Sequence, residues 1–397
     1  MNNLLKRTWA EIDLDALAHN FKTVRQAADP KAKLCCVVKA DAYGHGAVRI
    51  ALELETLGAD WFAVSNPEEA LQLRRGGIQK PILILGFTPP EAVAAMAENH
   101  ISLCVYSSEY AEEVSRAAVA AGVTVKIHIK VDTGMSRLGF YFQDLFRDET
   151  AFQEIEAACA LPGLFPEGVF THFAVSDEGQ PGDLFTMRQF GCFKELSEKL
   201  TRRGYTALIR HTANSAAVFD YPLSHLDMVR AGIVLYGLAP SDELRAKPDL
   251  QPVLSLKSVV SHVKTVLPGA TVSYGRKFTA DREMRVATVP IGYADGYPRA
   301  LAAGGAEVLL RGRRCHILGR ICMDQLMIDV SELSEVHIGD TVTLIGTDGE
   351  ETVTAADLAK CEGTIPYEVI CGLSKRVPRV YLKNGETDSV YDALLGD

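Results

Sequence analysis

A lysine stands directly after a short apolar run near the N-terminus. Residues 34–38 form the run, and Lys39 opens the segment Lys-Ala-Asp-Ala-Tyr-Gly-His-Gly. Burial at the end of a strand disfavours the ammonium form and lowers the pKa of a lysine, so its amine becomes a nucleophile that can form an imine with an aldehyde. The alternative is that Lys39 caps the strand and reaches solvent, as most lysines do.

Eight apolar runs of strand length must position this lysine and the groups that act with it. Helix-like patterns lie between several of them, with prolines at the expected starts and glycines after the ends, at 67–75, 90–99, 109–121 and 185–203. Eight strand–helix alternations predict an α/β fold, a (β/α)8 TIM barrel. An open doubly wound sheet is the rival, but the count of eight and the lack of a G-x-G-x-x-G after the first run favour the barrel. The runs lie at 34–38, 61–65, 82–86, 102–106, 126–131, 168–173, 209–212 and 228–236.

The reactive face of such a barrel is formed by the carboxyl ends of its strands. A single histidine there is more often a core residue than a catalyst, but many basic and polar groups converge on this rim. They are Lys39, Lys130, Asp132, Arg137, His172, His211, Asn214, Ser215, Arg230 and Gly232.

The loops after the seventh and eighth strands are where barrels bind phosphate. Asn214 and Ser215 offer a hydroxyl and backbone N–H groups at an expected helix start, and Gly232 allows close approach of the backbone. The alternative is that Asn214 or Ser215 is an ordinary helix N-cap.

The sequence pattern changes after Pro240. Residues 241–252 are polar and carry two prolines, which is typical of a linker, and residues 253–346 alternate with period two between turn signals. This predicts a second, mainly antiparallel β domain that closes with a short helix at 355–361 and a last strand at 379–382. We therefore expect a barrel over 1–245 and a β domain over 246–397.

Composition excludes several classes of protein. The formal charge of −10 argues against nucleic acid and anionic membranes as partners, and no apolar stretch is long enough to span a bilayer. The nine cysteines are scattered, with no C-x-x-C pair, so we expect buried thiols in a reducing, cytoplasmic compartment and no metal site.

Several segments resemble the alanine racemase family, in order and from about residue 8 to residue 380. In the barrel they are VVKADAYGHG from Val37, KVDTGMSRLG from Lys130 and MVRAGI from Met228. In the β domain they are VSYG from Val272, IGYADGY from Ile291, GRICMDQ from Gly319 and TIPYE from Thr364.

The resemblance implies pyridoxal 5'-phosphate as the cofactor. Lys39 would hold it as a Schiff base, and Tyr43 and Tyr367 would contact its phosphate. We expect Asn214, Ser215 and Gly232 to complete the phosphate site and His172 to be a further cofactor-binding residue. Arg230 would face the pyridine nitrogen. Arginine stays protonated, so the ring remains a weaker electron sink and the carbanion is reprotonated at Cα. The alternative for Arg230 is an ion pair with an acid such as Asp227.

The resemblance also implies how the substrate is held. Arg137 would bind the substrate carboxylate and the phenolic oxygen of the cofactor, as a guanidinium fork suits. Met323 and Asp324 would line the substrate site. Lys130 matches a lysine that many members carry as a carbamate, although an ordinary lysine fits nearly as well.

By this resemblance, the activity is the interconversion of L-alanine and D-alanine, which supplies D-alanine for cell-wall peptidoglycan. Lys39 would exchange the Cα proton of D-alanine through the cofactor aldimine, and Tyr274 that of L-alanine. A free tyrosine has a pKa of about 10, and His172 and Arg230 are the groups expected to make Tyr274 more acidic. On composition alone, Tyr274 would be a hairpin aromatic and Met323 a core residue.

The family pattern further implies a head-to-tail homodimer, in which each β domain completes the active site of the partner subunit. Three other activities stay open. They are a broader racemase that accepts serine, a decarboxylase of the same fold type, and a non-catalytic carrier of the cofactor. Arg230 argues against the decarboxylase, and the β domain argues against the carrier.

Overall fold

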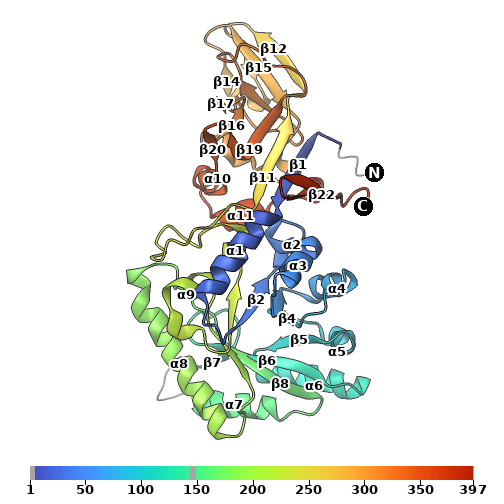
Figure 1. Cartoon of the computed structure of the whole chain (residues 1–397), viewed down its shortest axis with the longest axis vertical. Coiled ribbons are helices and arrows are strands. Elements are labelled where there is room, and N and C mark those ends of the chain that lie inside the picture. Colours follow the sequence, from blue (N-terminus) through green and yellow to red (C-terminus); the bar gives the residue numbers. More distant parts are fainter. Residues whose placement is uncertain (1–4, 144–148, 397) are drawn as a thin grey trace. The chain divides into compact units, whose positions relative to one another are not determined.

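The computed structural model of this chain describes residues 5–143 and 149–396. These residues divide into two compact units (Figure 1). One unit contains Met1–Ala16, Tyr43–Gly46 and Pro252–Asp397, and the other contains Leu17–Ala42 and Ala47–Gln251. We call them the β unit and the barrel unit.

The barrel unit is built on eight parallel strands in the order β10-β2-β3-β4-β5-β6-β8-β9, so the last strand pairs with the first. Strands β9 and β10 stand at the two ends of this order. Two backbone hydrogen bonds connect them, from Asp227 N–H to the carbonyl of Arg210 (3.1 Å) and from Arg230 N–H to the carbonyl of Ala213 (3.0 Å), so the barrel closes. The predicted (β/α)8 barrel is thus confirmed, and the open sheet is wrong. The strands are β2 (Lys33–Val37), β3 (Trp61–Val64), β4 (Ile82–Ile84), β5 (Ile101–Val105), β6 (Val125–Asp132), β8 (Leu164–Phe170), β9 (Ile209–His211) and β10 (Met228–Ala231), with the short β7 (Phe140–Tyr141) beside β6.

Helices follow the strands and lie around them in Figure 1. Side-chain caps begin two of them, because Asn66 accepts the N–H of Glu69 and Ser107 accepts the N–H of Tyr110. The four predicted helices are confirmed, with a 3-10 turn, η1 (Pro90–Ala92), opening the second. The helices are α1 (Leu14–Ala27), α3 (Ala47–Thr56), α4 (Pro67–Arg75), α5 (Val93–Glu98), α6 (Ser108–Ala121), α7 (Glu149–Cys159), α8 (Asp183–Arg202) and α9 (Ser215–Asp220).

Several predicted strands extend too far, and the last one shows the largest difference. The run at 228–236 is extended only as far as Ala231, and Ile233–Tyr236 forms the 3-10 helix η4. Gly232 between them has φ −120° and ψ −102°, which ends the strand. Because all residues of β10 and η4 are buried, both segments are mainly apolar, and the sequence showed them as a single apolar run.

The β unit is mainly antiparallel, as predicted. Its largest sheet has the order β17-β16-β19-β11-β1-β21-β22, and β12-β15-β18 and β13-β14 form smaller sheets. Only β1 and β21 pair in parallel among its described strands. The strands are β1 (Thr8–Asp13), β11 (Leu254–Val259), β12 (His262–Val266), β13 (Thr271–Val272), β14 (Phe278–Thr279), β15 (Met284–Val289), β16 (Glu307–Leu310), β17 (Arg313–His316), β18 (Leu326–Asp329), β19 (Thr341–Asp348), β20 (Glu351–Val353), β21 (Arg379–Lys383) and β22 (Glu386–Tyr391), with helices α10 (Ala355–Glu362) and α11 (Pro366–Cys371).

Two N-terminal segments belong to this unit although they are distant in sequence. Strand β1 lies between β11 and β21, and the loop Tyr43–Gly46 is held by side chains of β21. Arg379 Nε donates to the carbonyl of Gly44 and Tyr381 OH donates to that of His45, each at 3.0 Å. The strand predicted to be last is followed by β22.

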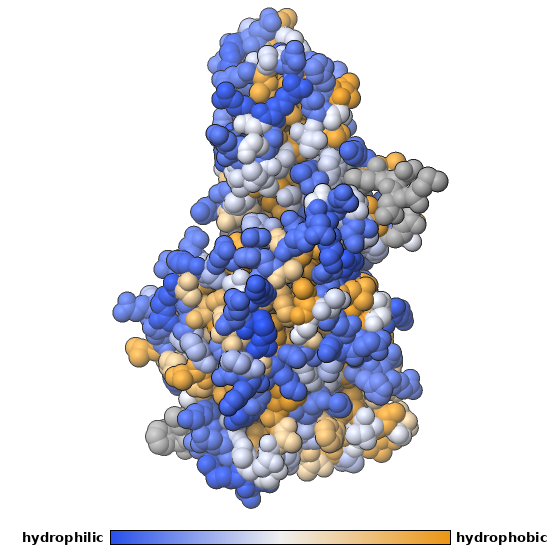
Figure 2. Space-filling view, viewed as in Figure 1, coloured by the Kyte–Doolittle hydropathy of each residue, from blue (hydrophilic) through white to orange (hydrophobic). Residues whose placement is uncertain are grey.

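The face in Figure 2 is largely hydrophilic, with apolar residues scattered over it. Within the described residues, no helix combines the length and the apolar character that a bilayer crossing requires. All nine cysteines are in the described part of the chain, and none of them forms a disulfide bond.

Candidate active site

Lys39 lies two residues beyond the end of β2 and precedes a left-handed turn. Ala40, Asp41 and Ala42 have φ between 52° and 54° and ψ between 47° and 50°. Each left-handed residue other than glycine costs about 1–2 kcal/mol, so the surroundings must hold this turn. Glu69 Oε1 accepts the N–H of Ala40 at 2.7 Å, and Asp41 Oδ1 accepts the N–H of Ala47 at 2.8 Å. The half-buried Lys39 therefore sits at the carboxyl end of β2 on a backbone that is fixed in an unfavourable conformation.

Lys130 lies at the same end of the barrel, near the carboxyl end of β6. It is buried, with Nζ donating to the carbonyl of Val131 at 2.9 Å and lying 5.5 Å from the ring centroid of Phe170. Burial lowers the pKa of Lys130 to about 8, and the charges of Arg230 and Arg137 act in the same direction. A sizeable fraction of this amine is therefore neutral near physiological pH.

Arg137 is exposed on the turn that follows β6. Asp132 shapes this turn, because its Oδ1 accepts the N–H groups of Gly134 (2.9 Å) and Ser136 (3.0 Å). Asp132 is therefore a structural residue of the rim, and it leaves the Arg137 guanidinium available for an anionic ligand.

Arg230 is buried on β10 and is surrounded by hydrogen-bond acceptors. Its guanidinium donates to the backbone carbonyls of His211 (3.0 Å), Thr171 (2.8 Å) and Thr212 (3.1 Å). The alternative prediction, an ion pair between Arg230 and Asp227, is wrong, because Arg210 binds the Asp227 carboxylate at 2.7 and 3.0 Å. Burial lowers the pKa of Arg230 to about 10, so the group stays charged at neutral pH.

Two histidines face this guanidinium through their Nδ1 atoms, His211 at 2.9 Å and His172 at 3.3 Å. Burial lowers the pKa of both well below the ordinary range, and Arg230 adds to this. The cations Lys130, Arg137 and Lys39 also depress the pKa of His172. The charges of four predicted site cations thus all act on one imidazole, which lies two residues beyond β8 and is kept neutral.

The predicted phosphate residues are placed at the start of α9 and after β10. Asn214 caps α9, because its Oδ1 accepts the N–H of Ala217 at 3.0 Å, so the N-cap alternative is confirmed for this residue. Ser215 Oγ accepts the N–H of Gly232 at 2.9 Å. The Ser215 hydroxyl proton is thereby directed away from Gly232 and can serve another acceptor.

Two tyrosines predicted at the phosphate come together within the β unit. Tyr43 is buried and Tyr367 is half-buried in the first turn of α11, and their ring centroids are 6.1 Å apart with planes inclined by 50°. The structure therefore pairs residues that are more than three hundred positions apart in sequence.

The other predicted residues of the β unit are exposed. Tyr274 opens the 3-10 turn η5 (Tyr274–Arg276), and 69% of its surface is accessible. Ser273 fixes the turn by donating to the carbonyl of Arg320 at 2.6 Å. Met323 is 53% exposed, so its interpretation as a core residue is wrong.

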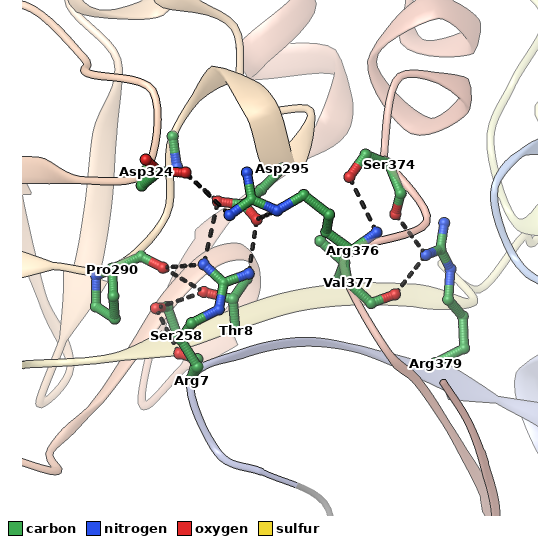
Figure 3. A network of polar contacts seen from close by, with 11 residues as sticks. Arg7, Thr8, Ser258, Pro290, Asp295, Asp324, Ser374, Arg376, Val377 and Arg379 are labelled. Carbon is green, nitrogen blue, oxygen red and sulfur yellow. Dashed lines mark hydrogen bonds and ion pairs between the residues drawn. The ribbon is translucent and has the colours of Figure 1, made fainter. Parts of the chain in front are cut away.

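Asp324 belongs to a polar network that the sequence did not reveal (Figure 3). Arg376 binds Asp324 at 2.9 Å and the buried Asp295 at 3.6 Å. Arg7 binds the same Asp295 carboxylate at 2.6 Å. The segments that carry Asp324 and Asp295 are therefore tied to the start of β1, although neither arginine stands in a recognisable motif.

Known proteins share this arrangement along nearly the whole chain. The sequence model of the alanine racemase N-terminal domain matches residues 12–240, and that of the C-terminal domain matches residues 253–381. The chain belongs to the alanine racemase family. The resemblance found in the sequence is thus confirmed.

Individual alanine racemases extend this result. That of Desulfovibrio desulfuricans is 47% identical over 375 residues, which cover 94% of this chain and 98% of the relative. The solved alanine racemase of Clostridium difficile 630 has a TM-score of 0.92 at 42% identity and covers 98% of this chain and 99% of the other. That of Bacillus anthracis with bound L-Ala-P has a TM-score of 0.92 at 38% identity, with 99% of each chain covered.

Proposed function

We propose that this protein interconverts L-alanine and D-alanine with pyridoxal 5'-phosphate as its cofactor. The observation that carries the proposal is the pair of the buried Arg230 and His172, 3.3 Å apart, at the same end of the barrel as Lys39, Lys130 and Arg137. An amine nucleophile, two guanidinium groups and a partly neutral lysine suit the carboxylate of an amino acid and the phosphate of an anionic cofactor. The names of the relatives support alanine as the substrate.

The donor groups of the chain fit this cofactor. Lys39 supplies an amine for an aldehyde, Arg230 supplies a donor for a ring nitrogen, and the Ser215 hydroxyl supplies a donor for a phosphate. We propose that Asn214, Gly232, Tyr43 and Tyr367 complete the phosphate site. When bound, the cofactor withdraws electrons from the attached amino acid and makes its Cα–H bond acidic.

The protein's own residues move the proton. Racemisation requires proton transfer on both faces of Cα, and we propose Lys39 for D-alanine and Tyr274 for L-alanine. His172 Nδ1 accepts from Arg230, so its proton is on Nε2, where it can donate to the phenolic oxygen of Tyr274. Arg230 can donate but cannot readily give up its proton, so the atom that it contacts stays unprotonated.

Arg137 is proposed to hold the alanine carboxylate, with Met323 and Asp324 at the substrate site. Lys130 is proposed to carry a carbamate. Carbamate formation adds carbon dioxide to the neutral amine and releases a proton, which leaves an anion on Lys130. This anion would replace repulsion between Lys130 and the two arginines by attraction.

We further propose a cytoplasmic homodimer in which Tyr274 of each chain completes the partner's site. The free cysteines fit a reducing compartment, and the exposure of Tyr274 and Met323 fits residues that act on a second chain. The product D-alanine would serve the cell-wall peptidoglycan.

Incubation with L-alanine in heavy water tests the function. We expect deuterium at Cα and the appearance of D-alanine without release of carbon dioxide, and we expect borohydride to fix the cofactor on Lys39. Carbon dioxide release would indicate a decarboxylase, and no exchange would indicate a carrier. Faster racemisation of serine than of alanine would contradict the proposed substrate.

A further inference from the structure

A row of polar side chains runs through the interior of the barrel from Arg230 to Glu167. Arg230 Nη1 lies 2.9 Å from His211 Nδ1, and His211 Nε2 lies 2.8 Å from His128 Nδ1. His128 Nε2 lies 3.4 Å from Glu167 Oε2, which is an electrostatic contact without the alignment of a hydrogen bond. Both histidines are fully buried, where apolar residues normally fill a barrel.

The chemistry of the groups fixes the direction of this row. A guanidinium has only donors, so His211 Nδ1 must accept and the His211 proton must be on Nε2. His211 Nε2 then donates to His128 Nδ1, which places the His128 proton on Nε2, facing the Glu167 carboxylate. Burial lowers the pKa of both histidines, which keeps the two rings neutral.

Glu167 enters the interior because of an irregularity in β8. The register between β6 and β8 shifts so that Ile127 pairs with Pro166 and His128 pairs with Gly168. Glu167 is therefore the extra residue of a β-bulge, a device that re-aims side chains. Lys126 binds Glu167 Oε1 at 2.6 Å, and Ser102 donates to Oε2 at 2.5 Å.

Aromatic neighbours pack against the rings of His211 and His128 and fix their orientations. His211 stacks on Phe170 with centroids 4.7 Å apart and planes inclined by 4°, and Trp61 meets His128 edge-on at 5.3 Å. A Cβ atom on Gly168 would lie 2.3 Å from His128 Nδ1. Glycine at position 168 therefore provides the space that the His128 ring occupies, and a larger residue there would clash with the ring.

We propose that Glu167, His128 and His211 are positioning residues. The two histidines orient Arg230 through one-directional hydrogen bonds, and the Glu167 carboxylate, in electrostatic contact with His128, balances the buried charge of Arg230 from a distance. The consequence for racemisation rests on the proposed function of Arg230 as the group that faces the cofactor nitrogen. The chain itself does not depend on that function.

Nitrogen NMR of the full-length protein labelled with 15N-histidine tests the chain directly. We expect His128 and His211 to be neutral with the proton on Nε2 between pH 6 and pH 9, with assignments from single variants. His225 is an internal reference, because its Nδ1 accepts the N–H of Asp29 and its Nε2 faces the Val218 carbonyl. Glu167→Gln should shift the 15N resonances of His211 and leave those of His225 unchanged.

Kinetics with matched variants test the consequence for Arg230. Removing the charge in Glu167→Gln should lower kcat by about tenfold with KM within about twofold, a size typical of residues that act through a network. Glu156→Gln removes a carboxylate paired with Arg203 on the surface and should change kcat by less than about twofold. His128→Gln keeps a donor and an acceptor and should retain kcat within about threefold, whereas His128→Met should lose about tenfold.

A proton on Nδ1 of His211, a charged His211, or a Glu167→Gln variant with unchanged His211 resonances would each overturn the chain. Equal activity of folded His128→Met and His128→Gln variants would overturn the positioning role. Protein that shows the expected ring protons but racemises no alanine would contradict the proposed function and leave the chain intact.

Discussion

Lys130 and Arg230 are both buried, and burial lowers their two pKa values by a similar amount. The pKa of Lys130 falls from 10.5 to about 8, and that of Arg230 falls from 12.5 to about 10. Because arginine starts from the higher value, lysine is the group that becomes partly neutral near pH 7. One rim therefore offers both a permanent cation and an amine that can react.

Carbamate formation on Lys130 should be visible in protein equilibrated with 13C-bicarbonate. About a tenth of an amine with a pKa of about 8 is neutral at pH 7 and about nine tenths at pH 9, so occupancy should rise with pH over this range. The carbamate 13C signal should disappear in Lys130→Arg and persist in Lys126→Arg, which alters an exposed lysine of the same strand. A signal that survives in Lys130→Arg would assign it elsewhere.

Glu167 should make stability depend on pH in acid. Burial raises the pKa of this carboxyl, but interactions with His128, Lys126 and Ser102 outweigh it and lower the pKa from 4.5 to about 2. The stabilisation is fully present above pH 4.5 and is lost as the pH falls toward 2, by about 3 kcal/mol. Chemical denaturation at pH 6, 4 and 3 should show wild type losing its advantage over Glu167→Gln. Parallel pH profiles would be inconsistent with an ionised Glu167.

The sequence reveals site residues where a regular pattern ends in an unusual side chain. Lys39, Lys130 and Arg230 were found because they lie on or end apolar runs. Glu167 was missed because it precedes the run predicted at 168–173, and a β-bulge leaves no periodic signal. Arg7 and Arg376 were missed because their partners are distant in sequence and only folding brings them together.

Strand β8 has an irregular local geometry, because its bulge leaves Glu167 unpaired between Pro166 and Gly168 against β6. Strand and helix positions in the barrel were predictable from periodicity and caps. The left-handed turn after β2 was not, since Ala40, Asp41 and Ala42 have no preference for that conformation and the contacts of Glu69 and Asp41 hold it.

Two glycine substitutions should separate steric fit from backbone effects. Gly168→Ala places a Cβ 2.3 Å from the His128 ring, and overpacking of this kind costs about 1–3 kcal/mol. Gly191→Ala lies within α8 with no atom within 4 Å of the new Cβ, and it should stabilise the protein by about 0.5–1 kcal/mol. Denaturant titration at neutral pH measures both. If Gly168→Ala and Gly191→Ala changed the free energy of unfolding equally, the side chains around His128 would have to move and accommodate the added methyl group.

At the scale of the whole molecule, each compact unit is assembled from separate parts of the sequence. β1 and Tyr43–Gly46 belong with residues 252–397, so the unit that carries Tyr274 needs N-terminal segments for its own sheet and loops. The sequence predicted the antiparallel character of this unit but not these segments, because pairing between distant strands has no local signature.

The proposed dimer can be tested by mixing two inactive proteins. Lys39→Ala and Tyr274→Ala should each be nearly inactive, because each lacks one base. If sites are shared between subunits, a mixed dimer has one site with both bases and one with neither. Random exchange makes about half of the dimers mixed, so activity should return to about a quarter of wild type. No recovery after exchange confirmed by mass would place both bases in one chain.

The most direct test of the account is the loss of the Cα proton from each alanine enantiomer in heavy water, followed by proton NMR in Tyr274→Phe. If Tyr274 acts on L-alanine and Lys39 on D-alanine, exchange of L-alanine should fall by about a hundredfold or more, while D-alanine still exchanges without racemising. Tyr391→Phe alters another exposed tyrosine of the same unit and should leave both rates unchanged. Exchange of L-alanine at the wild-type rate in Tyr274→Phe, or an equal loss for both enantiomers, would contradict the assignment of the two bases.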